Sequence, residues 1–360
     1  MSKGWFFTVD WMLLIPALIL VIFGLATLLS ISASYFFGQL LYIVFSLFVF
    51  FVFSHAHYLV IKLYAVPIYL VALIALVLVL VLGFESRGAV RWFDIAGFRI
   101  QFSEVFKPFL IISLSSFLAS GKNTSFSLFS FTLFLLFPIV LLVFLQPDLG
   151  SSLIYFFVVV ATMLVFGFPL RWFVGFFFFL SPFLPIAWQF LHDYQRQRIF
   201  AFLSPGSDPL GLSYNAIQAL IAVGSGLLFG KGLGQGTQSV LRFLPERHTD
   251  FIFATINESF GFVGGMIVLA SFTFLLYRIF ILSRLMDDTF RKLFCVGSFF
   301  LFLIQFFVNV GMNIGLTPVV GVTLPFVSYG GSSILSSFIL LGLLSSFSFH
   351  IKQQEVLEIR

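Results

Sequence analysis

The stretch YLVALIALVLVLVL at residues 69–82 is an unbroken apolar run that lacks the polar alternation of a half-exposed β-strand. Similar runs recur along the 360-residue chain, which is 60% hydrophobic and only 9% charged. Soluble domains are about 45–50% apolar and about 25% charged, so this composition excludes a soluble fold. A membrane β-barrel would require alternating strands. The sequence therefore predicts an all-α, polytopic integral membrane protein.

We predict about ten transmembrane helices from the positions of the apolar runs. They cover residues 11–31, 40–53, 64–83, 104–119, 126–145, 149–166, 172–191, 251–282, 293–310 and 332–349. The first run is longer than the apolar part of a typical signal peptide, so we expect an uncleaved span. The whole chain, 1–360, is expected to form a single transmembrane domain with a large extracytoplasmic loop at 192–250, between spans seven and eight.

An even number of spans places both termini on one side of the membrane. Lysine and arginine residues in the short loops of that side predict that it is cytoplasmic. The opposite side then holds longer segments at 84–103, 192–250 and 311–331. These segments carry seven arginines, Arg87, Arg91, Arg99, Arg196, Arg198, Arg242 and Arg247. Such outer arginines indicate a task such as holding an anionic ligand. No Lys/Arg run is present, so orientation and anionic membrane lipids explain the net charge of +5 better than nucleic acid does.

The segment 192–250 ends on the sequence PERHTD, directly before the eighth span. Its last residue, Asp250, adjoins Phe251, Ile252 and Phe253. Desolvation by these neighbours is expected to raise the carboxyl pKa and to make Asp250 a usable general base. The structural alternative is that Asp250 caps the helix that follows.

Three further positions carry polar groups near the outer ends of spans. Glu104 and Lys107 are three residues apart and share a helix face, which is typical of a functional pair or of a structural ion pair. Trp92 is either a residue of the interfacial aromatic belt or a platform for a sugar ring. Asp148 follows Pro147 and can cap the sixth span, with or without a role in a cavity.

The sequence predicts neither a nucleotide-binding P-loop nor a zinc site. The glycines around Lys231 depart from the GxxxxGK[ST] spacing, which excludes a P-loop, although their amides could hold a pyrophosphate or form a flexible loop. His248 and His192 do not make a zinc-type cluster. A divalent cation such as magnesium or manganese, held by carboxylates and a substrate pyrophosphate, is compatible with the sequence, and no metal ligand is assigned.

Several motifs occur together in a fixed order along the chain. They are GAVRW at 88–92, QFSEVFK at 101–107, QPDLG at 146–150, YQRQRI at 194–199, PERHTDFIF at 245–253 and PFVSYGGS at 325–332. With these motifs and ten predicted spans, the chain resembles the SEDS family (shape, elongation, division and sporulation). Arg247 favours the elongation branch of this family over the division branch.

The resemblance implies a peptidoglycan glycosyltransferase of the bacterial cytoplasmic membrane that polymerises lipid II. A class B penicillin-binding protein and other elongation-complex proteins are the implied partners. Asp250 matches the family's essential carboxylate. The expected substrate-binding residues are Trp92, Glu104, Lys107, Asp148, Arg196, Arg198, Arg247, His248 and Ser328. Where the family has a second acid after Glu258, this chain has Ser259, so neither is assigned a catalytic role.

In the implied reaction, the 4-hydroxyl of one lipid-linked GlcNAc attacks C1 of MurNAc in a second chain and expels undecaprenyl pyrophosphate. Asp250 would be the base. The candidates to neutralise the leaving group are Lys107, Arg196, Arg198 and Arg247. A lipid II flippase or transporter is the alternative, because the Gly/Pro-rich segment 311–331 fits a discontinuous helix. A non-catalytic scaffold for a transpeptidase is a third.

Overall fold

The computed structural model describes residues 9–86, 89–95, 98–121, 123–204, 208, 211 and 213–358. Arg87 lies outside the described residues. Within these ranges, nine helices are long and apolar enough to cross a membrane. They are α1 (Trp11–Ile31), α2 (Ala33–Ser54), α4 (Ala65–Leu82), α7 (Phe126–Leu145), α8 (Leu149–Phe166), the Leu170–Phe190 segment, α14 (Ile252–Leu285), α15 (Thr289–Asn313) and α16 (Gly331–Glu358).

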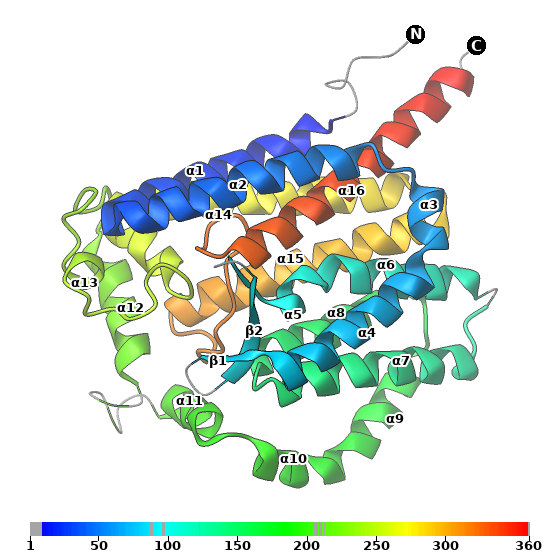
Figure 1. The fold of residues 1–360 in the computed structure, drawn as a ribbon, viewed down its shortest axis with the longest axis horizontal. Helices are drawn as coiled ribbons and strands as arrows, with labels where there is room; N and C mark the ends of the chain where they lie inside the picture. The colour runs from blue at the N-terminus through cyan, green and yellow to red at the C-terminus, as the bar shows by residue number, and fades with distance from the viewer. Residues whose placement is uncertain are drawn as a thin grey trace.

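The helices pack side by side in one bundle, with α15 in its interior (Figure 1). A small β-sheet formed within residues 84–100 lies toward one end of this bundle, as do α12 (Tyr214–Ser225) and α13 (Thr237–Val240). The short helix α3 (Tyr58–Leu63), the start of α1 and the end of α16 lie toward the other. Asp10 stabilises that second end, because it accepts hydrogen bonds from Arg278 of α14 at 2.6 Å and from Ser348 of α16 at 2.6 Å.

The fourth predicted span is shorter than expected. The region forms α5 (Phe102–Val105) and then α6 (Lys107–Ser120), which has only 14 residues. Phe106 separates the two helices, and Pro108 stands in the first turn of α6, where a proline needs no hydrogen-bonding partner for its nitrogen. This break places Glu104 and Lys107 on two different helices.

The seventh predicted span is bent. It consists of α9 (Leu170–Leu180), the 3-10 helix η2 (Ser181–Phe183) and α10 (Leu184–Phe190). Pro182 and Pro185 stand at the joints, where they prevent a continuous helix. Of residues 170–190, Phe173 alone is buried. In Figure 1 the segment arches away from the bundle.

Residues 84–103, expected to be a loop, contain a three-stranded antiparallel sheet. Its strands are β1 (Phe84–Ser86), β2 (Ala89–Ile95) and β3 (Phe98–Ile100), in the order β1-β2-β3. The prediction missed this sheet because strands of three residues leave no measurable alternation in the sequence. Strand β2 carries Arg91 and Trp92.

Residues 192–250, expected to be a large loop, contain short helices in their described part, one of them in the apolar, helix-compatible stretch 214–229. They contain α11 (Asp193–Leu203), α12 and α13, and α12 packs on the first half of α14. Helix α14 is broken at Gly261, where φ is 68° and ψ is −165°. This break frees backbone groups on both sides of it, and a neighbouring segment bonds to them.

That neighbouring segment is the glycine-rich stretch, which lies against the break in α14. Lys231 N donates to Glu258 O at 2.9 Å, and Gly232 N donates to Ser259 O at 3.1 Å. A Cβ on Gly226 would lie only 1.8 Å from the carbonyl oxygen of Asn257. The interpretation as a flexible loop is therefore wrong. The amides of residues 231 and 232 are already hydrogen-bonded and do not form a pyrophosphate cradle.

Candidate active site

The site is built around the turn that precedes α14. Glu246 has a positive φ of 49°, and its carbonyl oxygen accepts hydrogen bonds from the amides of Thr249 and Phe251. A second turn, just before α16, is hydrogen-bonded to the first. Ser328 Oγ donates to Thr249 O at 2.7 Å, and Tyr329 N donates to His248 O at 2.9 Å. The predicted substrate-binding residue Ser328 thus has a structural role in this turn.

Two asparagines of α15 fix the backbone at Asp250. Asn309 Nδ2 and Asn313 Nδ2 each donate to Asp250 O at 3.0 Å. Asn313 Oδ1 also accepts from Ala254 N, in the first turn of α14, at 2.9 Å. Helix α14 begins at Ile252 with no side-chain cap. The structure therefore does not use Asp250 as the helix cap, and its carboxylate is available for another purpose.

The Asp250 carboxylate lies beside Gly321. A Cβ at residue 321 would lie 3.4 Å from Asp250 Oδ2 and 3.5 Å from Arg198 Nη1, so this glycine leaves space next to both groups. Burial raises the pKa of Asp250 to about 6, opposed by Arg198 and reinforced by Glu246. Arg91 and Asp148 influence the same pKa more weakly, which places all of these charges around one point.

Asp148 is buried and fully engaged. One carboxylate oxygen caps α8 by accepting from Ser151 N at 3.1 Å. The other accepts from Gln101 Nε2 at 2.9 Å and from Ser103 Oγ at 3.3 Å. The capping prediction is confirmed, and the same side chain ties α8 to the α5 segment.

Glu104 and Lys107 form an ion pair of 2.5 Å, with side chains only 9% and 1% exposed. Within the described part of the chain, Glu104 Oε2 is buried without a hydrogen-bond partner. Burying two charges costs several kcal/mol unless their remaining hydrogen-bonding capacity is satisfied. Lys107 satisfies one oxygen of the Glu104 carboxylate, and the other oxygen, Oε2, has unused capacity to accept a hydrogen bond.

Arg91 links three segments of the chain at this site. Its Nε donates to Gln146 O at 3.0 Å, and its Nη2 donates to Pro147 O and to Tyr194 Oη. Tyr194 Oη in turn donates to Pro147 O at 2.6 Å. Trp92, the next residue on β2, is half-buried. Arg91 thus fastens the sheet to the 146–147 turn and to α11.

The predicted arginines of α11 separate in space. Arg198 is half-buried, packs its guanidinium over the Tyr194 ring at 5.5 Å and lies near Asp250. Arg196 instead donates to the carbonyl oxygens of Trp188 and Gln189 at the end of α10, and pairs with Asp193 at 3.7 Å. Its contacts are local, so the structure brings Arg198 into the site and gives Arg196 a different role.

Arg247 and His248 occupy the turn itself. Arg247 Nε is buried without a hydrogen-bond partner among the described residues, and burial, with Arg242 nearby, lowers the pKa of Arg247. The His248 ring stacks on Tyr35 of α2, with centroids 4.3 Å apart. In the part of the chain that is described, no group of three or more His, Cys, Asp or Glu side chains has the arrangement of a metal site.

Sequence reasoning missed several residues of this site. Asn309 and Gln101 hold Asp250 and Asp148, respectively; Asn309 was not singled out, and Gln101 was noted only as part of the motif at 101–107. A signal was present: Asn309 and Asn313 are polar residues four apart in an otherwise apolar span, so they share one helix face. Glu258, which was assigned no catalytic role, lies in a different setting. Its carboxylate accepts from the amides of Gln238 and Ser239, at the start of α13.

The comparisons with known proteins agree on one family. The family model FTSW_RODA_SPOVE, described as "Cell cycle protein", matches residues 5–353. The chain belongs to the SEDS family. It is 41% identical to the peptidoglycan glycosyltransferase MrdB of Escherichia coli K12 over 292 residues, 79% of this chain and 78% of that protein. It is 37% identical to the probable peptidoglycan glycosyltransferase FtsW of Trichlorobacter lovleyi, over 80% of this chain and 77% of that one.

Solved structures support the same assignment. A chain from a peptidoglycan synthase complex that coordinates polymerization and crosslinking matches with a TM-score of 0.82 and 30% identity, over 96% of this chain and 99% of that one. The rod shape determining protein RodA of Thermus thermophilus matches with a TM-score of 0.72 and 28% identity, over 94% and 97%. This SEDS protein is a multi-span membrane protein.

Proposed function

We propose that this SEDS protein is a peptidoglycan glycosyltransferase of the elongation type, with Asp250 as its general base. One observation carries the catalytic assignment. The Asp250 carboxylate has a pKa of about 6, does not cap α14, and lies next to Gly321, whose lack of a side chain leaves room for one small group beside Asp250 Oδ2 and Arg198 Nη1. A carboxylate with this pKa is mostly ionised at neutral pH and is a stronger base than an ordinary aspartate.

The chemistry that fits these groups is polymerisation of lipid II. The 4-hydroxyl oxygen of the acceptor GlcNAc forms a bond to C1 of the donor MurNAc, and the bond from C1 to the pyrophosphate oxygen breaks. Asp250 takes the hydroxyl proton, a step typically worth about 10²–10⁴-fold in rate. The electron pair of the broken bond leaves with undecaprenyl pyrophosphate.

The leaving pyrophosphate needs positive charge where it departs. Arg198 and Arg247 suit this role, because one lies beside Asp250 and the other has a buried Nε without a described partner. Lys107 is already paired with Glu104, and Arg196 is bonded to α10, so we leave both out of this step. Glu104 Oε2, Trp92 and His248 remain proposed contacts to the sugar and peptide parts of the substrate. Asp148 has a positioning role in this proposal, since it accepts a hydrogen bond from Gln101, next to α5.

The proposed setting follows from the family and the charge distribution. We place the protein in the bacterial cytoplasmic membrane as a single SEDS domain, with both termini cytoplasmic and segment 192–250 extracytoplasmic. A class B penicillin-binding protein is the proposed transpeptidase partner, with other elongation-complex proteins. A divalent cation would have to take most of its ligands from the substrate, since the described side chains offer no converging set, and no step above depends on it.

The test is polymerisation of lipid II by the purified chain in lipid vesicles, with products separated on a gel. Asp250→Asn is expected to lower the rate by at least about 10²-fold. Asp193→Asn is the matched control, because it removes a carboxylate that is exposed on α11, and it should polymerise at the native rate. Translocation of lipid II across the vesicle without glycan formation would replace this proposal by a flippase.

A further inference from the structure

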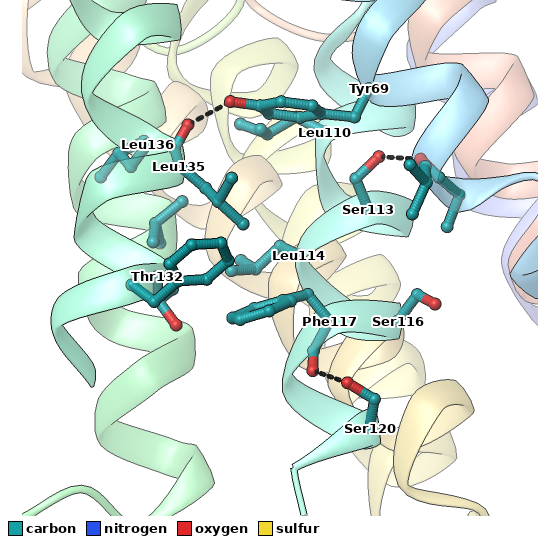
Figure 2. Close-up of a pocket in the computed structure, with 14 residues that line it drawn as sticks. Tyr69, Leu110, Ser113, Leu114, Ser116, Phe117, Ser120, Thr132, Leu135 and Leu136 are labelled. Carbon is teal, nitrogen blue, oxygen red and sulfur yellow. Dashed lines mark hydrogen bonds between the residues drawn. The ribbon is translucent and has the colours of Figure 1, made fainter. Parts of the chain in front are cut away.

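A cavity of about 390 Å³ lies between α4, α6 and α7 (Figure 2). Tyr69, Leu114, Phe117, Thr132 and Leu136 are among its lining residues. Val66 and Phe131, which also line it, are 69% and 46% exposed, so the cavity opens on the outer surface of the helix bundle. In a membrane-spanning bundle, that surface faces lipid.

The walls of this cavity favour hydrocarbon. Five lining residues carry hydroxyl groups, and each donates its hydrogen to backbone: Tyr69 to Leu135 O, Ser113 to Ala65 O, Ser116 to Lys62 O at 3.5 Å, Ser120 to Phe117 O and Thr132 to Leu128 O. Figure 2 shows three of these bonds along the cavity. With the donors used, the surface that remains offers dispersion contacts and little hydrogen bonding. A chain of methylene groups fits such a surface better than water does.

A second pocket, of about 420 Å³, adjoins the first at the turn between α6 and α7. The two pockets share Phe117 and Phe131, whose ring centroids are 5.1 Å apart. The second pocket has a polar lining that includes Asn123, Ser125 and Ser127. An apolar cavity that leads into a polar pocket has the form of a site for an amphiphile, with its chain in one and its head in the other.

We propose that the two pockets together bind one membrane glycerophospholipid, with an acyl chain between α4, α6 and α7 and the headgroup against Asn123, Ser125 and Ser127. The site is not the proposed substrate site. Lys107 begins α6 and Ser120 ends it, so the cavity extends to a point about 20 Å along the helix from the ion pair with Glu104. A lipid whose headgroup lies at Asn123 is in the opposite leaflet from one whose headgroup lies at Asp250.

The test is photolabelling of the full chain in vesicles of phosphatidylethanolamine and phosphatidylglycerol that contain a phosphatidylglycerol with a diazirine in its acyl chain. Peptides of the protein are then analysed by mass spectrometry. We expect label to concentrate on the cavity residues of α6 and α7. Ser116→Trp fills the cavity and should lower this label about tenfold, the effect of a ~1.4 kcal/mol loss of binding. Phe134→Trp, on the lipid-facing side of α7 outside the cavity, is the matched control and should leave it unchanged.

Three results would overturn the proposal. The first is equal labelling of the cavity residues and of exposed α7 residues such as Phe137, which would indicate bulk lipid only. The second is unchanged label in Ser116→Trp. The third is displacement of the label by equimolar undecaprenyl phosphate, which would make the occupant a polyprenyl chain. If Ser116→Trp does not fold, as judged by thermal unfolding, Asn123→Leu in the polar pocket replaces it and should also reduce the label.

Discussion

Asn313 Nδ2 donates a hydrogen bond of 3.0 Å to the backbone carbonyl oxygen of Asp250, so a core residue of α15 fixes the position of the proposed base. Asn309 donates to the same oxygen and also to Val322 O, at 2.7 Å. Val322 follows Gly321, which lies beside the Asp250 carboxylate. Asn309 thus links the backbone at Asp250 to the backbone at Val322, and Asn313 adds a second bond to Asp250. Preorganisation of this kind is what a catalytic group requires.

Asn313→Leu is expected to slow polymerisation by about 10–100-fold, because a displaced Asp250 loses alignment with its substrate. The loss should appear in kcat more than in KM. Ser298→Ala is the matched control on the same helix, since the Ser298 hydroxyl is buried without a partner among the described residues. If Asn313→Leu lowers only the melting temperature and leaves kcat unchanged, the asparagine is structural and does not position the base.

The Glu104–Lys107 pair can be separated into its structural and functional parts by a double variant. Lys107→Met alone should destabilise the protein by about 3–5 kcal/mol, because it leaves the Glu104 carboxylate buried and unpaired. Glu104→Gln combined with Lys107→Met removes both charges and should recover most of that stability. Thermal unfolding and polymerisation are measured on each variant.

The double variant decides between the two explanations of this pair. We expect it to fold and yet polymerise poorly, because it has lost the negative charge of Glu104, which we propose contacts the substrate. Native polymerisation by the stable double variant would mean that the pair has a structural role only.

Gly226→Ala tests whether the glycine-rich segment serves packing. Its Cβ would overlap the carbonyl oxygen of Asn257, so the first half of α14 must move, and we expect a loss of several degrees in melting temperature. Gly224→Ala is the matched control, because no atom lies within 4 Å of its Cβ and its helical position favours alanine. Equal melting temperatures for the two variants would refute the packing role.

Many of the helices could be predicted from the sequence, because residues at their ends signal where they begin. Helices α7 and α8 begin where predicted, after Ser125 and Asp148, whose side chains accept from backbone amides in the first turn. The break of α14 at Gly261 could not be predicted in this way. It is stabilised by a segment some thirty residues earlier, which bonds across the break, and no local pattern indicates such a partner.

The charged residues of the site could be proposed from the sequence. The polar residues that hold them in place were harder to find. Asp250 and Arg198, which were each proposed as site residues, both lie next to Gly321 in the structure. Arg196, two residues from Arg198, points to α10 because one helix presents residues i and i+2 on different faces. Asn309 was missed because its hydrogen bond to Asp250 O joins residues 59 apart in the chain, a contact that its spacing from Asn313 does not reveal.

Asp250→Asn should also change stability in a way that depends on pH. The pKa of Asp250 is raised in the folded state, so its ionised form destabilises the fold above pH about 6, and this penalty fades as the pH falls toward the unfolded value. We therefore expect Asp250→Asn to melt at a higher temperature than the native chain at pH 8, with a smaller difference at pH 5. An equal or lower melting temperature at pH 8 would contradict the raised pKa.

The most direct test of Asp250 as the base is the pH dependence of single-turnover polymerisation of lipid II by the purified chain. The account predicts that the rate falls with decreasing pH below about 6, approaching tenfold per pH unit, as Asp250 becomes protonated. The residual activity of Asp250→Asn should lack this limb. A native rate that stays constant from pH 8 down to pH 5 would contradict the assignment of Asp250 as the general base.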